Sequence, residues 1–442
     1  MSEGNRKILI IALPAIVTNI TVPLLGLVDT AIVGHMGDAA YIGAIAVGSM
    51  IFNLVYWVFG FLRMGTSGLT AQARGRRDFA EVRQLLSRST LVSWAIALLI
   101  LLLQWPLREL MLWFIGPTPD VRPLAVTYFN IVVWGAPAML GLYGLTGWYI
   151  GMHNTRIPLF VSIFQNVVNI LASLALVYGV GMKVEGVAIG TVIAQYAGYM
   201  AAVAWLWRYY RRLLVKTVCP GGFFPPADAG RQQTAGGSSL AQFLRVNRDI
   251  FFRTVFLVVV NLYFTSAGAR QGAVILAVNT LMMQFYLLFS YVLDGFAYAG
   301  EALCGSYWGA QNDQAFRAVV RRLFLWGGAM TGLFTVIYAV GGVSFLQLLT
   351  DEDAVIEAAR SYLWWVMVIP AAGVAAFIWD GIFIGITHTR GMLWATALSA
   401  LVFFVVVITL MPVLGNHALW LSMVLFLAMR GLIQTWFFSL LP

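Results

Sequence analysis

Long apolar runs alternate with short polar segments along the whole chain. Each run approaches or exceeds the ~20 apolar residues that an α-helix needs to cross a lipid bilayer. The first set of runs covers residues 8–33, 41–72, 84–105, 122–149, 157–179 and 185–213. The second set covers residues 249–267, 271–307, 318–340, 354–385, 392–411 and 417–440. The pattern predicts an all-α polytopic membrane protein with twelve transmembrane helices.

One polar segment is longer than the others and divides the two sets. Residues 214–247 contain Cys-Pro-Gly-Gly, Phe-Phe-Pro-Pro and Ala-Gly-Gly-Ser-Ser sequences, a composition that favours loop over helix. We therefore expect an N-terminal lobe over 1–213 (transmembrane helices 1 to 6), a cytoplasmic linker over 214–247, and a C-terminal lobe over 248–442 (transmembrane helices 7 to 12).

The composition supports a membrane protein. Hydrophobic residues make up 61% of the 442 positions and charged residues only 10%, whereas soluble proteins average about 25% charged residues. Most of the 27 Lys and Arg residues lie at the N-terminus or in the loops after even-numbered runs. The net charge of +9 therefore indicates topology rather than nucleic-acid binding. The positive-inside rule predicts a multi-pass protein of a bacterial-type inner membrane, with both termini in the cytoplasm.

An internal repeat relates the two sets of helices. Residues 147–156 match residues 381–390 at five of ten positions, and Tyr128 and Tyr362 share the same separation. Each half has an even number of predicted spans, so both halves enter the membrane from the same side. This is the parallel-repeat plan of secondary carriers, in which two halves rock about a site near the bilayer midplane. A duplicated but static bundle is the alternative.

Few ionisable residues lie deep within the predicted spans. Placing such a side chain inside a membrane costs free energy, so each one is a functional candidate. These residues are Asp29, Arg63, Asp294, Glu301 and Asp380. Asp380 has Thr146 as its partner in the repeat, so this acid belongs to one half only. That asymmetry favours a specialised role for Asp380.

Asp29 lies in the outer half of the first predicted helix, fifteen residues after Pro14. Proline removes a backbone donor, so Pro14 predicts a bend in this helix. A carboxylate held away from water takes up a proton more readily. Asp29 is therefore either a proton-exchanging group beside a moving element or an acid that only holds helices together.

Arg63 and Asp294 lie in helices that the repeat makes equivalent, about one helical turn apart in depth. We hypothesise that they form a gate between the lobes on the cytoplasmic side, with Glu301 as another partner. In the alternative, each charge is satisfied within its own half.

No residue pattern in the chain predicts a metal, a cofactor or an enzyme active site. Cys219 and Cys304 are far apart and show no metal-binding spacing. The four histidines are scattered through loops and loop edges without shared spacing. Acidic residues 351–353 are interpreted as a solvated helix start. We therefore expect no cofactor beyond the coupling ion.

Five segments carry a resemblance to a known family. They are residues 27–34, 59–73, 247–250, 293–299 and 379–385. Together they make the chain resemble the multidrug and toxic compound extrusion (MATE) family, in its DinF-like branch, over essentially the whole length. The resemblance implies two six-helix lobes facing each other in a V. It also implies efflux of organic, often cationic or amphiphilic compounds, driven by inward movement of protons or sodium.

The resemblance also implies roles for particular residues. Asp29 would belong to a polar cluster with Asn169 and Thr191, and Pro14 would be the bend-forming proline of helix 1. Related proteins often carry a second acid four residues after the asparagine, where this chain has Ser173. A single carboxylate is a poorer metal-ion ligand than a pair, so the sequence favours proton coupling over sodium coupling.

The sequence therefore predicts a monomeric antiporter that exports organic compounds in exchange for protons. Asp29 is the expected coupling residue, and Asp294 and Asp380 form a second route in the other lobe. The expected partners are small organic substrates, protons and membrane lipids, without nucleic acid. The alternative function is a flippase for lipid-linked or amphipathic substrates, which a lateral groove lined by basic residues would favour.

Overall fold

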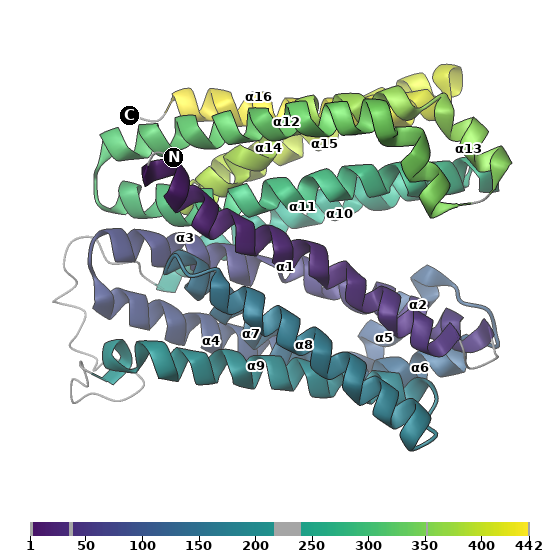
Figure 1. Cartoon of the computed structure of the whole chain (residues 1–442), viewed down its shortest axis with the longest axis horizontal. Coiled ribbons are helices and arrows are strands. Elements are labelled where there is room, and N and C mark those ends of the chain that lie inside the picture. Colours follow the sequence, from purple (N-terminus) through teal and green to yellow (C-terminus); the bar gives the residue numbers. More distant parts are fainter. Residues whose placement is uncertain (1–2, 35–38, 216–239, 351, 441–442) are drawn as a thin grey trace. The chain divides into compact units, whose positions relative to one another are not determined.

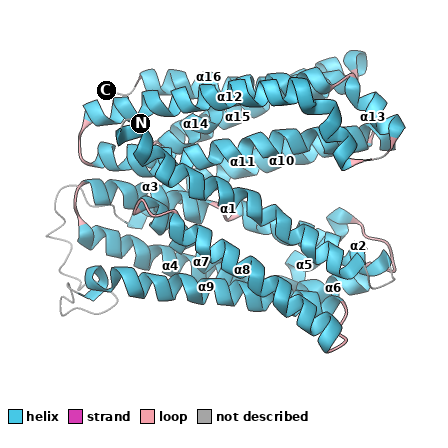
Figure 2. Ribbon diagram, in the orientation of Figure 1, coloured by secondary structure: helices cyan, strands magenta, loops and turns pink. Residues whose placement is uncertain are grey.

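The structure is a computed structural model that describes residues 3–34, 39–215, 240–350 and 352–440. Over these residues the regular elements are helices and no strand occurs (Figures 1 and 2). Eleven helical segments are long and apolar enough to cross a membrane. Together with the 32-residue helix α1, they agree with the prediction of twelve transmembrane helices. The all-α polytopic fold class is confirmed.

The helices up to the inter-lobe segment are α1 (Glu3–Gly34), α2 (Ala39–Val58), α3 (Phe61–Gly75), α4 (Phe79–Leu102), α5 (Gln104–Ile115), α6 (Arg122–Val132), the 3₁₀ turn η1 (Val133–Gly135), α7 (Ala136–Gly151), α8 (Arg156–Leu174), the π-helical turn η2 (Ala175–Gly179) and α9 (Val184–Val215). The later helices are α10 (Leu240–Ala269), α11 (Ala273–Gly309), α12 (Asp313–Leu349), α13 (Asp353–Arg360), α14 (Leu363–Gly385), α15 (Thr389–Leu414) and α16 (Asn416–Ser439).

Several predicted runs are divided in the structure. The run 41–72 breaks between α2 and α3, where Phe59 and Gly60 form a turn and the Leu62 N–H donates to the Phe59 carbonyl at 3.1 Å. Glycine disfavours the helix interior, which accounts for a break at this point. The run 354–385 is similarly divided into α13 and α14. The predicted linker contains the first eight residues of α10, and its middle, residues 216–239, lies outside the described residues.

Packing divides the chain into two units. We call residues 17–244 the N-terminal unit, and residues 1–16 with 245–442 the C-terminal unit. Helix α1 contributes its first part to the C-terminal unit and the remainder to the N-terminal unit. Each unit is described by itself below.

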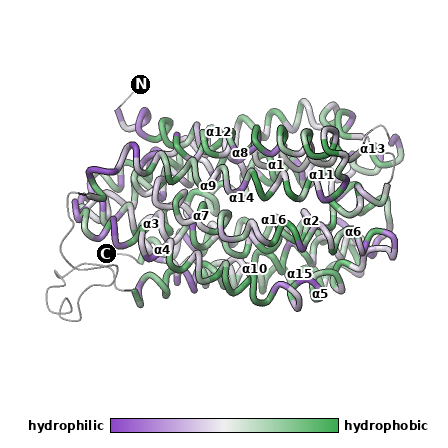
Figure 3. Tube along the Cα trace, turned by 90° about the horizontal axis from the view of Figure 1, so that it is seen from below, coloured by the Kyte–Doolittle hydropathy of each residue, from purple (hydrophilic) through white to green (hydrophobic). Residues whose placement is uncertain are grey.

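Each unit has a helical core of large side chains. In the N-terminal unit, Trp148 and Tyr149 of α7 are fully buried. The Trp148 indole N–H donates to the Val82 carbonyl of α4 at 2.9 Å, and the Tyr149 hydroxyl donates to the Ala202 carbonyl of α9 at 2.7 Å. In the C-terminal unit, the Tyr338 hydroxyl of α12 donates to the Phe285 carbonyl of α11 at 2.6 Å. Apolar residues dominate the middle of the helices and hydrophilic residues gather toward their ends (Figure 3), as a bilayer requires.

The internal repeat is visible in the turns of both units. Arg77 and Gln311 are 234 residues apart, and both have a positive φ, of 59° and 53°. The next residues, Asp78 and Asn312, cap α4 and α12 with side-chain oxygens that each accept a backbone N–H at 3.0 Å. The same strained turn followed by the same N-cap shows that the repeat preserves backbone conformation where the sequences differ.

The repeated glycines have a shared packing role. A Cβ on Gly147 of α7 would lie 2.2 Å from the Arg63 carbonyl oxygen of α3. A Cβ on Gly381 of α14 would lie 2.3 Å from the Ala297 carbonyl oxygen of α11. Position 63 plus 234 is 297, so the two helix crossings are equivalent. Small residues permit this close approach of helices in a membrane, which explains why the glycines recur in both halves.

Candidate functional site

A small polar cluster joins α8 and α9 in the N-terminal unit. The Asn169 side-chain amide donates to the Thr191 hydroxyl at 3.2 Å, and that hydroxyl donates to the Val187 carbonyl of its own helix at 3.0 Å. Asn169 has no exposed surface. The structure thus brings together two of the residues that the family resemblance placed in one cluster.

This cluster has unused hydrogen-bonding capacity. The Asn169 Oδ1 and the Ser173 Oγ are buried and have no hydrogen-bond partner within the described residues. The two residues lie four apart on α8, so they share one face of that helix. A buried acceptor without a donor is costly, above all inside a bilayer. The site is therefore suited to a ligand or side chain that donates a hydrogen bond.

Helix α1 contacts α8 before the Asn169 cluster and η2 after it. The Asn166 side-chain amide donates to the Thr21 carbonyl, and the Tyr178 hydroxyl donates to the Ile32 carbonyl, each at 3.2 Å. Asp29 lies on α1 between these two contacts. Its backbone is helical, but its side chain lies outside the described residues, and its membership of the cluster stays a prediction.

Pro14 lies within α1, whose helical assignment continues from Glu3 to Gly34. The division between the two units falls two residues later, between Ile16 and Val17. A bend at Pro14 stays a prediction.

A second, charged cluster lies in the C-terminal unit and centres on Asp380 of α14. One carboxylate oxygen, Oδ2, accepts hydrogen bonds from the guanidinium groups of Arg253 on α10 and Arg430 on α16, the latter at 2.5 Å. The other oxygen, Oδ1, accepts from the Gln434 amide at 2.7 Å. These four side chains are buried. Asp380 is thus an ionised acceptor held by three donors from two neighbouring helices.

Asp294 on α11 belongs to the same electrostatic environment. It lies close enough to interact with the Arg253 guanidinium and with the Tyr286 hydroxyl. Two of the predicted cation-binding acids, Asp294 and Asp380, thus have an arginine nearby. Their role in cation binding stays a prediction.

The predicted gate residues lie on different elements. Arg63 is half-buried on α3 of the N-terminal unit, and Asp294 is half-buried on α11 of the C-terminal unit. Glu301 is buried on α11, at the position equivalent to Ser67. A gate formed by these residues stays a prediction.

Sequence reasoning missed both arginines that bind Asp380, Arg253 and Arg430. Arg253 lies only four residues after the start of the predicted span 249–267, where a basic residue is typical of a cytoplasmic helix end. The structure begins α10 nine residues earlier, at Leu240, which places Arg253 inside the helix. The sequence did offer one signal, because Asp380 and Arg430 are charges of opposite sign within predicted spans. Their separation of 50 residues, however, does not predict that they are in contact.

Comparison with solved structures defines the class of protein. A multidrug resistance MATE family transporter in an outward-facing conformation matches with a TM-score of 0.86, covering 99% of this chain and 95% of that chain at 16% identity. The Vibrio cholerae MATE transporter VcmN in its bent form also matches at 0.86, covering 99% and 97% of the two chains at 16% identity. The fold is that of a MATE-type membrane transporter.

Sequence comparison gives the family. The MatE family model matches residues 14–175 and 250–410. DNA damage-inducible protein F of Escherichia coli is 36% identical over 98% of this chain and 91% of its own length. Protein DETOXIFICATION 44, chloroplastic, of Arabidopsis thaliana is 24% identical over 98% and 82%. The chain belongs to the MatE family and is a transporter rather than an enzyme.

Proposed function

We propose that the protein is a secondary active antiporter that exports organic, cationic or amphiphilic compounds in exchange for protons. Several relatives support an efflux role, among them a probable multidrug resistance protein, NorM, of Thermotoga maritima, which is 23% identical over 81% of this chain and 75% of its own length. The observation that carries the proposal is the pair of buried acceptors without donors, Asn169 Oδ1 and Ser173 Oγ.

The presence of one candidate carboxylate beside these acceptors, rather than two, favours a proton over a sodium ion. A protonated carboxyl group donates a hydrogen bond and an ionised one does not. The family resemblance assigns that acid to Asp29, whose helix contacts α8 on one side of the cluster and η2 on the other. Sodium is a hard cation that is best held by several oxygens including carboxylates. Ser173 stands where related proteins carry a second acid, which leaves one candidate carboxylate for this site.

Coupling follows if the two ligands use the site alternately. An ionised Asp29 attracts an organic cation, and a proton taken up from outside removes that attraction while supplying a donor to the α8 acceptors. The proton and the substrate thereby favour different states of the same site, which an exchange mechanism requires. We place the arginine-rich ends on the cytoplasmic side. In the exchange that we propose, the proton moves inward and the substrate moves outward.

Transport into liposomes tests the proposal. The full-length protein is reconstituted, a pH gradient or a sodium gradient is imposed, and uptake or release of a fluorescent organic cation is followed. We expect the pH gradient alone to drive transport, and we expect Asp29→Asn and Asn169→Leu each to reduce the initial rate at least tenfold. Asn261→Leu is the matched control, because the Asn261 amide is satisfied by the Leu257 carbonyl of its own helix at 2.8 Å.

Two results would overturn the proposal. One is gradient-driven transport by Asp29→Asn at the wild-type rate, and the other is transport that requires sodium and ignores the pH gradient. A labelled-lipid translocation assay in the same liposomes tests the alternative function. Lipid flipping without transport of the organic cation would identify a flippase.

A further inference from the structure

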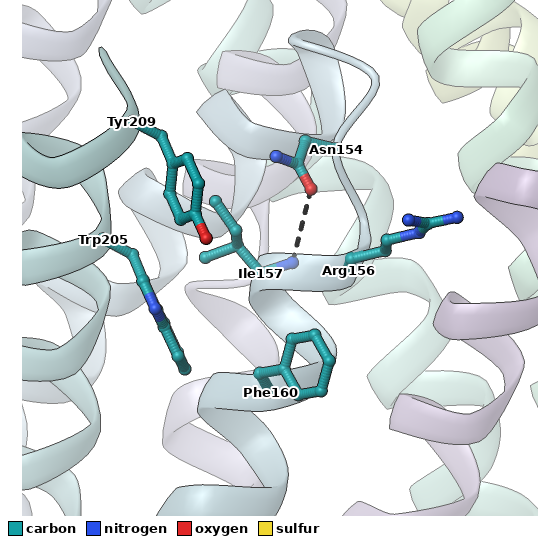
Figure 4. Close-up of a pocket in the computed structure, with 6 residues that line it drawn as sticks. All are labelled: Asn154, Arg156, Ile157, Phe160, Trp205 and Tyr209. Atoms are coloured by element: carbon teal, nitrogen blue, oxygen red, sulfur yellow. Dashed lines mark hydrogen bonds between the residues drawn. The ribbon is translucent and has the colours of Figure 1, made fainter.

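A cavity lies at one end of the N-terminal unit, between the start of α8 and the end of α9. It has a volume of about 450 Å³ and is lined by Asn154, Arg156, Ile157, Phe160, Trp205 and Tyr209. We call it the α8–α9 slot. In Figure 4 the rings of Trp205 and Tyr209 extend from one helix toward Ile157 and Phe160 of the other, and the Arg156 guanidinium lies at the opposite rim. The slot therefore has aromatic walls and a basic edge.

Hydrogen bonds hold the slot in shape without a ligand. The Asn154 side-chain oxygen accepts the Ile157 backbone N–H at 3.4 Å, and its amide donates to the Tyr210 hydroxyl of α9 at 3.2 Å. The rings of Phe160 and Trp205 lie 6.1 Å apart between centroids. Asn154 thus ties the loop before α8 to α9, so a ligand that enters the slot need not order it first.

Basic residues continue the slot beyond its aromatic part. Trp205, Arg208, Tyr209 and Arg212 have the spacing i, i+3, i+4, i+7, which places them on one stripe of α9. Arg208 and Arg212 are exposed, as is Arg156. The structure gives these three arginines no hydrogen bond or ion pair with any described residue. Between residues 152 and 215 the only acid is Glu185, which lies in the first turn of α9 at its opposite end.

The repeat shows that this slot is specific to the N-terminal unit. Adding 234 to Arg156 and Phe160 gives Arg390 and Trp394, so the basic and aromatic residues at the start of α8 recur at the start of α15. Helix α9 runs for 32 residues from Val184, whereas α16 runs for 24 residues from Asn416. Helix α16 is therefore eight residues shorter, and the extra length of α9 is the part that carries Arg208, Tyr209 and Arg212.

We propose that the α8–α9 slot binds an anionic phospholipid from the membrane leaflet next to the arginine-rich helix ends. The phosphate is held by Arg156, Arg208 and Arg212, and the glycerol and upper acyl chain lie against Trp205 and Phe160. Basic pockets between transmembrane helices on the cytoplasmic side select anionic headgroups in this way. The inference concerns lipid recognition and does not depend on which ion or substrate the transporter uses.

Two observations favour a lipid over a free phosphate ion. Most of the lining is apolar or aromatic, and a phosphate ion alone leaves those side chains uncovered. Phe160 is 55% exposed on a membrane-spanning helix, which opens the slot toward the bilayer. An amphiphile with a negative head and an apolar tail satisfies both parts of the slot.

Native mass spectrometry of the purified full-length protein in detergent tests the proposal. Phosphatidylglycerol and phosphatidylcholine of identical chain length are titrated separately, and the dissociation constant of the first bound lipid is measured. We expect phosphatidylglycerol to bind the wild type at least tenfold more tightly. Arg156→Gln combined with Arg212→Gln should weaken phosphatidylglycerol binding by roughly fivefold per arginine. Binding of phosphatidylcholine should weaken less, because the choline group offsets the charge of its phosphate.

Arg390→Gln is the matched control, because it removes the equivalent arginine where α16 provides no slot. It should leave the affinity for phosphatidylglycerol unchanged. Trp205→Ala keeps all the charges and should weaken the binding of both lipids, because it removes one aromatic wall of the slot. Equal affinity of the wild type for the two lipids would overturn the proposal. So would a loss of phosphatidylglycerol affinity in Arg390→Gln as large as that in the Arg156→Gln and Arg212→Gln double variant. Displacement of the lipid by inorganic phosphate at millimolar concentration would identify a free anion site instead.

Discussion

The two units use one helical scaffold for different chemistry. In the N-terminal unit the buried polar cluster around Asn169 contains no charged side chain among the described residues, and two of its acceptors lack donors. In the C-terminal unit the Asp380 carboxylate is already bound by Arg253 and Arg430. A site with open acceptors can still accept a hydrogen bond from an incoming donor, whereas a carboxylate between two guanidinium groups resists losing its partners.

The difference shows why an acid within a membrane span is not by itself a coupling residue. Asp29 and Asp380 both meet that description in the sequence. Only the packing of α10 and α16 around α14 reveals that Asp380 has two permanent counter-charges. We therefore propose that the C-terminal cluster stabilises its unit and that ligand exchange takes place at the N-terminal cluster; the cation-binding role predicted for Asp380 stays a prediction.

The largest expected effect is the loss of the Asp380 carboxylate. Asp380→Ala leaves two guanidinium groups buried without their shared acceptor, and breaking a buried ion pair in this way costs about 3–5 kcal/mol. Thermal unfolding of the purified protein in detergent should show a marked decrease in Tm. The control is Thr146→Ala at the equivalent position of the N-terminal unit, which should change Tm little. Equal stability of both variants would mean that the charged cluster does not hold the C-terminal unit together.

Substitution of the repeated glycines tests the shared scaffold and should have an intermediate effect. Gly147→Ala and Gly381→Ala each place a methyl group less than 2.5 Å from a backbone carbonyl oxygen of the facing helix. Forcing the helices apart should cost about 1–3 kcal/mol in either unit, read as a decrease in Tm. Gly328→Ala in α12 is the control, because no atom lies within 4 Å of its added methyl group. A large effect at only one of the two crossings would contradict their equivalence.

The smallest expected effect concerns the loops at the start of α8 and α15. Asn154 and His388 occupy equivalent positions, and the His388 ring packs against Phe383 with centroids 5.4 Å apart. Burial lowers the pKa of His388 below the ordinary histidine value of about 6.5.

A lowered histidine pKa means that the folded state disfavours protonation. Its contribution to stability is complete above about pH 6.5 and is lost as the pH falls toward the folded-state pKa. The Tm of the wild type should therefore decrease slightly more between pH 7 and pH 5 than the Tm of His388→Asn, which carries the residue found in the N-terminal unit. Identical pH profiles would show that His388 does not contribute.

The sequence was sufficient for the fold class and for the repeat. The length and spacing of the apolar runs determine how many helices cross the membrane, because a bilayer leaves the backbone no alternative to internal hydrogen bonding. The recurring glycines revealed the repeat, and the structure then showed that they mark equivalent helix crossings, where close approach of two backbones leaves no room for a side chain. Helix breaks within long apolar runs, such as the turn at Gly60, were less visible because both flanking segments are equally apolar.

Only the tertiary structure determined which buried polar groups are partners. Arg253, Asp380 and Arg430 are separated by 127 and 50 residues, and no local pattern links them. Asn169 and Thr191 were placed together by family resemblance, but the unsatisfied oxygen beside them appears only when α8 and α9 are packed. The hydropathy pattern is read along one helix at a time. The energy of a buried charge or acceptor instead depends on the donors and counter-charges that every neighbouring helix places beside it.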